Sequence, residues 1–75
     1  MLAYVQIAAD PDRESKILDS LRKMAQVKES YIVFGEWDIL AKVETTNPEE
    51  LGSFVVAKIR PLSGIKNTKT LIVAK

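Results

Sequence analysis

The sequence contains no cysteine and no histidine among its 75 residues. The absence of cysteine excludes disulfide bonds and thiolate metal sites. The absence of histidine removes the commonest metal ligand and the usual general base near neutral pH. No arrangement of serine, cysteine and histidine typical of nucleophilic catalysis is present. We therefore expect no metal, no cofactor and no enzymatic activity.

No block of like charge occurs either, because 11 basic and 10 acidic residues are mixed along the chain and leave a net charge of +1. This balance gives no basic footprint for direct nucleic-acid binding. No apolar stretch reaches the roughly 18 residues that a membrane span needs. The opening residues MLAYVQIAAD lack the basic start of a secretory signal. We expect a cytoplasmic protein.

The length of 75 residues predicts a single domain over residues 1–75. A chain of this size buries only roughly 60% of its unfolded surface, so it is marginally stable alone. Small domains compensate with disulfides, metals or partners. Since the sequence offers no disulfide or thiolate metal site, we expect oligomerisation.

The first half of the chain predicts a strand, a helix and a second strand. Residues 2–9 are apolar on both alternating faces, which is typical of a buried strand. Asp10 and Pro11 predict a helix start, with Asp10 or Asp12 as the cap. The helix then shows one apolar stripe made of Ile17, Leu18, Leu21, Met24 and Ala25.

The second half predicts a hairpin, a helix and a last strand. Residues 27–34 and 37–44 are rich in β-branched and aromatic residues and are joined by a short loop at Gly35. Asn47 is a candidate cap, and Pro48 suits the first helical position. The stripe of this helix consists of Leu51, Phe54, Val55, Lys58 and Ile59. Pro61 is expected to end the helix before a strand at residues 65–74.

The order β-α-β-β-α-β predicts an α+β ferredoxin-like fold, a four-stranded antiparallel sheet with both helices on one face. Two helices cover only one face, yet large apolar side chains occupy both faces of the middle strands: Tyr31 and Val33 alternate with Ile32 and Phe34, and Ile39 and Val43 with Leu40. An exposed apolar face of this size usually marks an interface. We expect a homodimer with its sheets packed face to face, the alternative being a monomer with an open apolar face.

Two motifs in this pattern carry a resemblance to a known family. Residues 35–39 read GEWDI between the hairpin strands, and residues 64–70 read GIKNTKT at the last strand. Together they resemble the G-x-x-D turn and the G-V-x-x-T-x-T strand of the C-terminal effector domain of the Lrp/AsnC family, also called the RAM domain. The resemblance covers the chain from Leu2 to Ala74.

The resemblance implies a regulatory, ligand-binding function in a dimeric α/β barrel. In that family, dimers form through the sheets and assemble further into octamers or other rings, and small effectors, commonly amino acids, bind between dimers. The family's regulators carry an N-terminal helix-turn-helix, whereas this chain begins at the first strand. We therefore expect a stand-alone effector domain that modulates transcription by associating with full-length Lrp/AsnC-type regulators.

Six positions carry the family's binding motifs: Gly35, Glu36, Trp37, Asp38, Thr68 and Thr70. The Asp38 carboxylate is suited to accept from an amino acid's ammonium group. Backbone N–H groups at Gly35 are suited to hold its carboxylate. The two threonine hydroxyls point to one face of the strand because they are two residues apart.

Plainer interpretations of these residues remain open. Gly35 supplies a positive φ to the turn, and Asp38 is a candidate cap for the turn's own amides. Trp37 is a ligand wall or a packing anchor between dimers. At the level of function, a small cofactor-independent oxygenase and a purely structural oligomeriser are the alternatives to a regulatory domain. The oxygenase hypothesis predicts a closed apolar cavity inside each protomer, between the helices and the sheet.

Overall fold

The predicted order of elements is confirmed in the computed structural model, which describes residues 1–75. The strands are β1 (Leu2–Ala9), β2 (Val27–Ile32), β3 (Ile39–Glu44) and β4 (Ile65–Ile72). A 3-10 turn, η1 (Pro11–Arg13), leads into helix α1 (Glu14–Arg22), and helix α2 (Pro48–Phe54) continues into a π-helical turn, η2 (Val55–Ile59). None of the helices is both long and apolar enough to cross a membrane.

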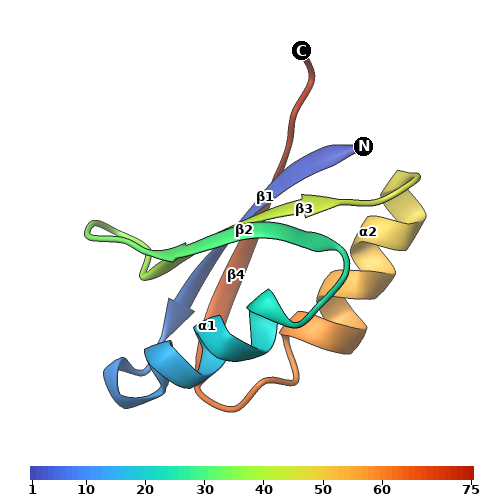
Figure 1. The fold of residues 1–75 in the computed structure, drawn as a ribbon. Helices are drawn as coiled ribbons and strands as arrows, with labels where there is room; N and C mark the ends of the chain where they lie inside the picture. The colour runs from blue at the N-terminus through green and yellow to red at the C-terminus, as the bar shows by residue number, and fades with distance from the viewer.

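All four strands form one antiparallel sheet in the order β2-β3-β1-β4. Both helices lie against the same face of this sheet, and the opposite face is left open (Figure 1). This arrangement is the ferredoxin-like fold expected from the sequence. It places β2 and β4 at the two edges and β3 and β1 in the middle of the sheet.

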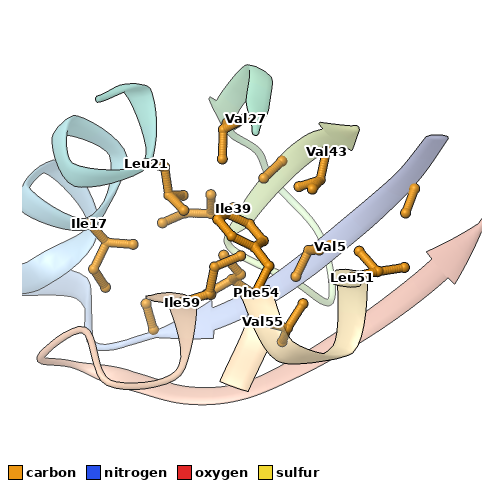
Figure 2. Close-up of a cluster of buried hydrophobic side chains, with 14 residues drawn as sticks. Val5, Ile17, Leu21, Val27, Ile39, Val43, Leu51, Phe54, Val55 and Ile59 are labelled. Carbon is orange, nitrogen blue, oxygen red and sulfur yellow. The ribbon is translucent and has the colours of Figure 1, made fainter. Parts of the chain in front are cut away.

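The core lies between the helices and the inner face of the sheet (Figure 2). Strand β1 alternates strictly between fully buried and half-buried residues along its length. A single cluster of 14 buried residues fills this layer: Ala3, Val5, Ile7, Ala9, Ile17, Leu21, Val27, Ile39, Ala41, Val43, Leu51, Phe54, Val55 and Ile59.

The start of the first helix differs from the prediction. Neither Asp10 nor Asp12 forms a side-chain cap, and α1 begins after Arg13 without one. The chain instead enters through η1, where the Arg13 N–H donates to the Asp10 carbonyl at 2.9 Å. The Asp10 carboxylate lies 3.4 Å from the Lys66 ammonium group, and the 3-10 turn separates Asp10 from the first residue of α1.

The second helix begins as predicted, because the Asn47 side chain accepts from the Glu50 N–H at 2.8 Å. It does not continue as an α-helix to Pro61, since the Arg60 N–H donates to the Val55 carbonyl at 2.9 Å and widens the last turn. Lys58 is exposed rather than part of the buried stripe. Its charged group needs water, which the inner face does not offer.

Three further predictions of the apolar pattern need correction. Ala25 is exposed, because α1 has already ended when the chain reaches it. The hairpin loop covers residues 33–38, since β2 ends at Ile32, so Val33 and Phe34 do not belong to the strand. Strand β4 ends at Ile72.

The outer face of the sheet carries a group of apolar side chains, mixed with polar ones, that a single chain leaves uncovered. The register places Tyr4 of β1 beside Leu71 of β4, and Leu40 of β3 beside Tyr31 of β2. Tyr31 and Leu71 are exposed, at 47% and 46%. This outer face is the surface for which the sequence predicts a second copy of the chain.

We expect Ile39→Ala to lower the free energy of unfolding by about 2–5 kcal/mol, because it leaves a cavity in the core. Ile32 is paired with Ile39 across the β2–β3 ladder but is 43% exposed, whereas Ile39 is 0% exposed. Ile32→Ala is therefore the matched control and should cost clearly less. Urea unfolding of both variants measures the difference, and equal losses would contradict the assigned core.

Candidate functional site

The loop between β2 and β3 is the first part of the candidate site. Its ends are closed by the Val33 N–H, which donates to the Asp38 carbonyl at 2.8 Å. Gly35 has φ 143°, a conformation that favours glycine, so its expected role in the turn is confirmed. Phe34 beside it is completely exposed. The loop thus projects from the end of the sheet as a polar and aromatic tip (Figure 1).

Asp38 joins this loop to the central strand. Its carboxylate accepts from the Ala9 N–H at 2.9 Å, and its own N–H donates to the Ile7 carbonyl at 2.9 Å. Strand β1 changes register against β4 between Ala8 and Ala9, so the aspartate provides an acceptor where the ladder is irregular. Asp38 therefore caps the end of β1 and not the amides of its own turn.

A hollow of about 370 Å³ lies against this loop on the outer face of the sheet. The loop contributes Gly35, Glu36 and Trp37 to its lining, together with Val33 and Phe34. Gln6 of β1 and Lys69 of β4 complete it. The hollow thus contains one acid and one lysine, which is the pair of charges that a zwitterion would need.

The sequence motifs did not indicate Gln6 or Lys69 as part of the site. The two residues are paired in the β1–β4 register, which brings them to the same rung on the outer face. That register depends on the irregular step between Ala8 and Ala9, and no sequence motif gives it. The alternation of β1 alone would have placed Gln6 on the outer face.

Thr68 and Thr70 lie away from the loop hollow within one chain. They are paired with Ile7 and Val5, whose side chains are in the core, so both threonines face the helix side of the sheet. The Arg60 Nε–H donates to the Thr68 hydroxyl at 3.4 Å. The predicted shared face of the two hydroxyls is confirmed, but it is the face opposite to the loop hollow.

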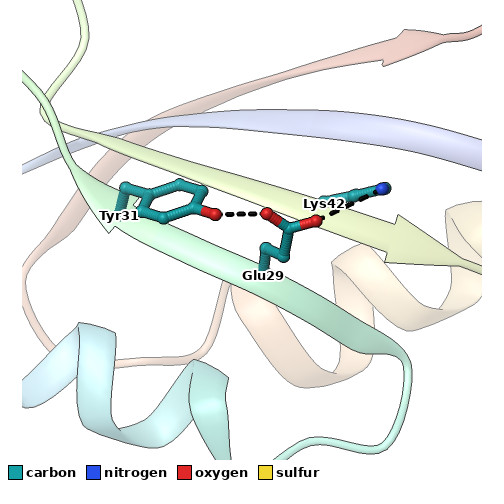
Figure 3. A network of polar contacts seen from close by, with 3 residues as sticks. All are labelled: Glu29, Tyr31 and Lys42. Atoms are coloured by element: carbon teal, nitrogen blue, oxygen red, sulfur yellow. Dashed lines mark hydrogen bonds and ion pairs between the residues drawn. The ribbon is translucent and has the colours of Figure 1, made fainter.

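A polar cluster lies on the outer face near the β2 edge (Figure 3). The Lys42 Nζ donates to the Glu29 carboxylate at 3.2 Å, and the Tyr31 hydroxyl donates to the same carboxylate. The Tyr31 hydrogen bond, followed by Lys42, lowers the pKa of Glu29. The bond to Glu29 raises the pKa of both Tyr31 and Lys42. Because the groups are exposed, the cluster contributes little to stability.

The family follows from comparison with known proteins. Residues 2–75 match the model of the Lrp/AsnC ligand binding domain. The chain belongs to the Lrp/AsnC family. The resemblance carried by the GEWDI and GIKNTKT motifs is therefore confirmed over nearly the whole chain.

Among curated relatives, this Lrp/AsnC domain is 40% identical over 73 residues to an uncharacterized HTH-type transcriptional regulator of Pyrococcus furiosus. The match covers 93% of this chain and 49% of that protein, so the chain spans about half the length of the regulator. The names of such relatives assign the family to transcription regulation.

Solved structures agree with the fold. TTHA0845 of Thermus thermophilus is 31% identical with a TM-score of 0.93, over 99% of this chain and 92% of that one. The transcriptional regulator NMB0573 of Neisseria meningitidis, solved as a complex with L-Met, has a TM-score of 0.91 over 99% of this chain and 49% of that one. At 21% identity, the second likeness shows the fold alone.

We expect Asp38→Ala to destabilise the fold by about 1–3 kcal/mol, because the N–H of the buried Ala9 would lose its acceptor. Asp38→Asn keeps an acceptor oxygen at the same place and should recover most of this loss. Thermal unfolding of the two variants measures the difference. An Asn variant as unstable as the Ala variant would show that the charge, and not the hydrogen bond, is what the end of β1 needs.

Proposed function

We propose that this chain is a regulatory effector domain that binds an amino acid or a related small metabolite at a boundary between subunits. It would modulate transcription in association with Lrp/AsnC-type regulators, and it would act by binding and not by catalysis. The observation that carries the proposal is the loop hollow, because it combines charges of both signs with an aromatic wall in a ligand-binding family. The L-Met complex of the Neisseria regulator supports an amino acid as the class of ligand. The cytoplasmic location expected from the sequence stays a prediction.

Each end of an amino acid has a suitable partner in the proposed site. Lys69 would bind the carboxylate, together with backbone N–H groups at Gly35. Glu36 would accept from the ammonium group, and one oxygen of Asp38 is already engaged by Ala9. Trp37 is half-buried and would form the wall beside the ligand's side chain. Thr68 and Thr70 could join this site only from a neighbouring chain, because they face the opposite side of their own sheet.

The outer face would form the subunit boundary. Exposed apolar surface of this kind marks interaction sites, and the sheet offers it beside the loop hollow. A face-to-face dimer would cover Tyr4, Leu40 and Leu71 while leaving the loop at its margin. Assembly into an octamer or another ring would then bring loops of different dimers together.

A small oxygenase is the less favoured function. That hypothesis needs a closed apolar chamber inside the protomer, between the helices and the inner face of the sheet, and this layer is filled by the core cluster (Figure 2). The hollow with charged groups lies outside the core instead. We therefore keep the regulatory proposal.

Binding can be tested by thermal unfolding in the presence of each of the standard amino acids. A ligand at 100 times its Kd should add about 2.7 kcal/mol to the free energy of unfolding. Lys69→Met should abolish the stabilisation. Lys66→Met is the matched control, since Lys66 is on the same strand but outside the hollow. No stabilisation by any amino acid, with a defined oligomer mass, would favour the purely structural oligomeriser.

The dimer can be tested with two neighbouring residues of β4. Leu71 and Ile72 are exposed to a similar degree, at 46% and 51%, but they face opposite sides of the sheet. We expect Leu71→Asp to give a monomer by light scattering, because it puts an unpaired charge into the proposed interface. Ile72→Asp should leave the dimer intact. A dimer that survives Leu71→Asp but not Ile72→Asp would move the interface to the helix side.

A further inference from the structure

A second hollow lies on the helix side of β4, away from the loop. It has a volume of about 320 Å³ and is bordered by α2, η2 and β4. Its apolar walls include Val55 and Val56 of η2 and Ile72 of β4. Arg60 and Thr70 supply its polar groups. The loop and α2 lie at opposite ends of the sheet, so this groove is separate from the proposed amino-acid site (Figure 1).

The groove carries only positive charge. Arg60 is the only charged residue that lines it, and no acid is present among the lining residues. The Arg60 Nε–H donates a long hydrogen bond of 3.4 Å to the Thr68 hydroxyl, so the guanidinium group lies beside β4. A guanidinium group has five N–H donors arranged as a fork that matches a carboxylate, so the remaining donors are suited to an acid.

The backbone around the groove departs from regular helix geometry. The π-helical turn Val55–Ile59 provides two of the apolar wall residues and immediately precedes Arg60. Such turns occur frequently at functional sites. The wide turn ends at Arg60, whose N–H donates to the Val55 carbonyl at 2.9 Å. The irregular backbone therefore lies directly beside the only charged residue of the groove.

Gly52 of α2 lines the groove and is a second indication that the groove has a function. A Cβ at this position would meet no atom within 4 Å, so close packing within the chain does not require glycine there. Glycine in a helix is destabilising relative to alanine. Its presence leaves open space above the helix backbone, next to the apolar walls.

We propose that this groove binds a small aliphatic carboxylate. Its acid group would lie on the Arg60 guanidinium group and the Thr70 hydroxyl, and its hydrocarbon part on Val55, Val56 and Ile72 above Gly52. The volume matches the lower range of small-ligand pockets, about 300 Å³. Since no acid lines the groove, an α-ammonium group would find no charged acceptor. The groove therefore selects a monocarboxylate without an amine over the corresponding amino acid.

The test is an NMR titration of the ¹⁵N-labelled chain with 4-methylpentanoate. We expect saturable shifts of the Gly52, Val56 and Thr70 amides. The neutral amide of the same shape, 4-methylpentanamide, and the amine-bearing analogue L-leucine should each bind to this groove at least tenfold more weakly.

Substitutions inside and outside the groove show where the probe binds. Arg60→Met should weaken 4-methylpentanoate binding at least tenfold, whereas Lys58→Met, which removes an exposed cation of the same segment outside the groove, should not. Gly52→Leu should fill the groove, because the position has room for a side chain to start: a Cβ there would meet nothing within 4 Å. Lys69→Met should leave this binding unchanged even though it removes the proposed amino-acid site, so the two proposals can fail independently.

Several results would overturn the proposal. They are shifts confined to the loop, equal binding of acid and amide, or full binding by Arg60→Met. Shifts of the groove amides that follow protein concentration without any added probe would also overturn it, since they would show that a second copy of the chain occupies the groove.

Discussion

The architecture depends on the fact that two short helices cover only one face of a four-stranded sheet. Burial of that face is achieved by alternate residues of β1 and β3 together with one stripe from each helix. The other residues of the same strands are then left on a face that the chain itself cannot cover. A domain of this size is marginally stable. Covering the exposed apolar side chains with a partner would add stability, so this face is suited to be a binding surface.

Much of the fold follows from the sequence because local and long-range signals agree. Asn47 followed by Pro48 and two glutamates predicts the start of α2, and the Asn47 side chain is indeed the cap. At the start of α1 the same reasoning fails, because the 3-10 turn η1 separates Asp10 from the helix, which begins at Glu14. Cap prediction places the cap directly before the helix, whereas here an extra 3-10 turn lies between and leaves the Asp10 carboxylate beside Lys66 of β4.

The site could be predicted only in part, because the pairing register of β1 and β4 decides which side chains reach it. The turn motif correctly indicates a loop with a positive φ at Gly35. Gln6 and Lys69 reach the same hollow through the pairing of β1 with β4, which depends on a bulge that no motif reports. The same register turns Thr68 and Thr70 toward the helices. A spacing of two residues predicts that two side chains share a face, but it does not say which face.

Strand β4 contributes residues to both hollows, one on each face of the sheet. Successive side chains of this strand point alternately to the outer face of the sheet and to the face that the helices cover. Lys69 therefore lines the loop hollow while Thr70, its neighbour in sequence, lines the groove beside α2. A shift of β4 by one residue along β1 would exchange the two faces and remove both sets of polar groups from their hollows. The register of this one strand, which pairs with β1 as its single neighbouring strand, thus determines the chemistry on both sides of the sheet.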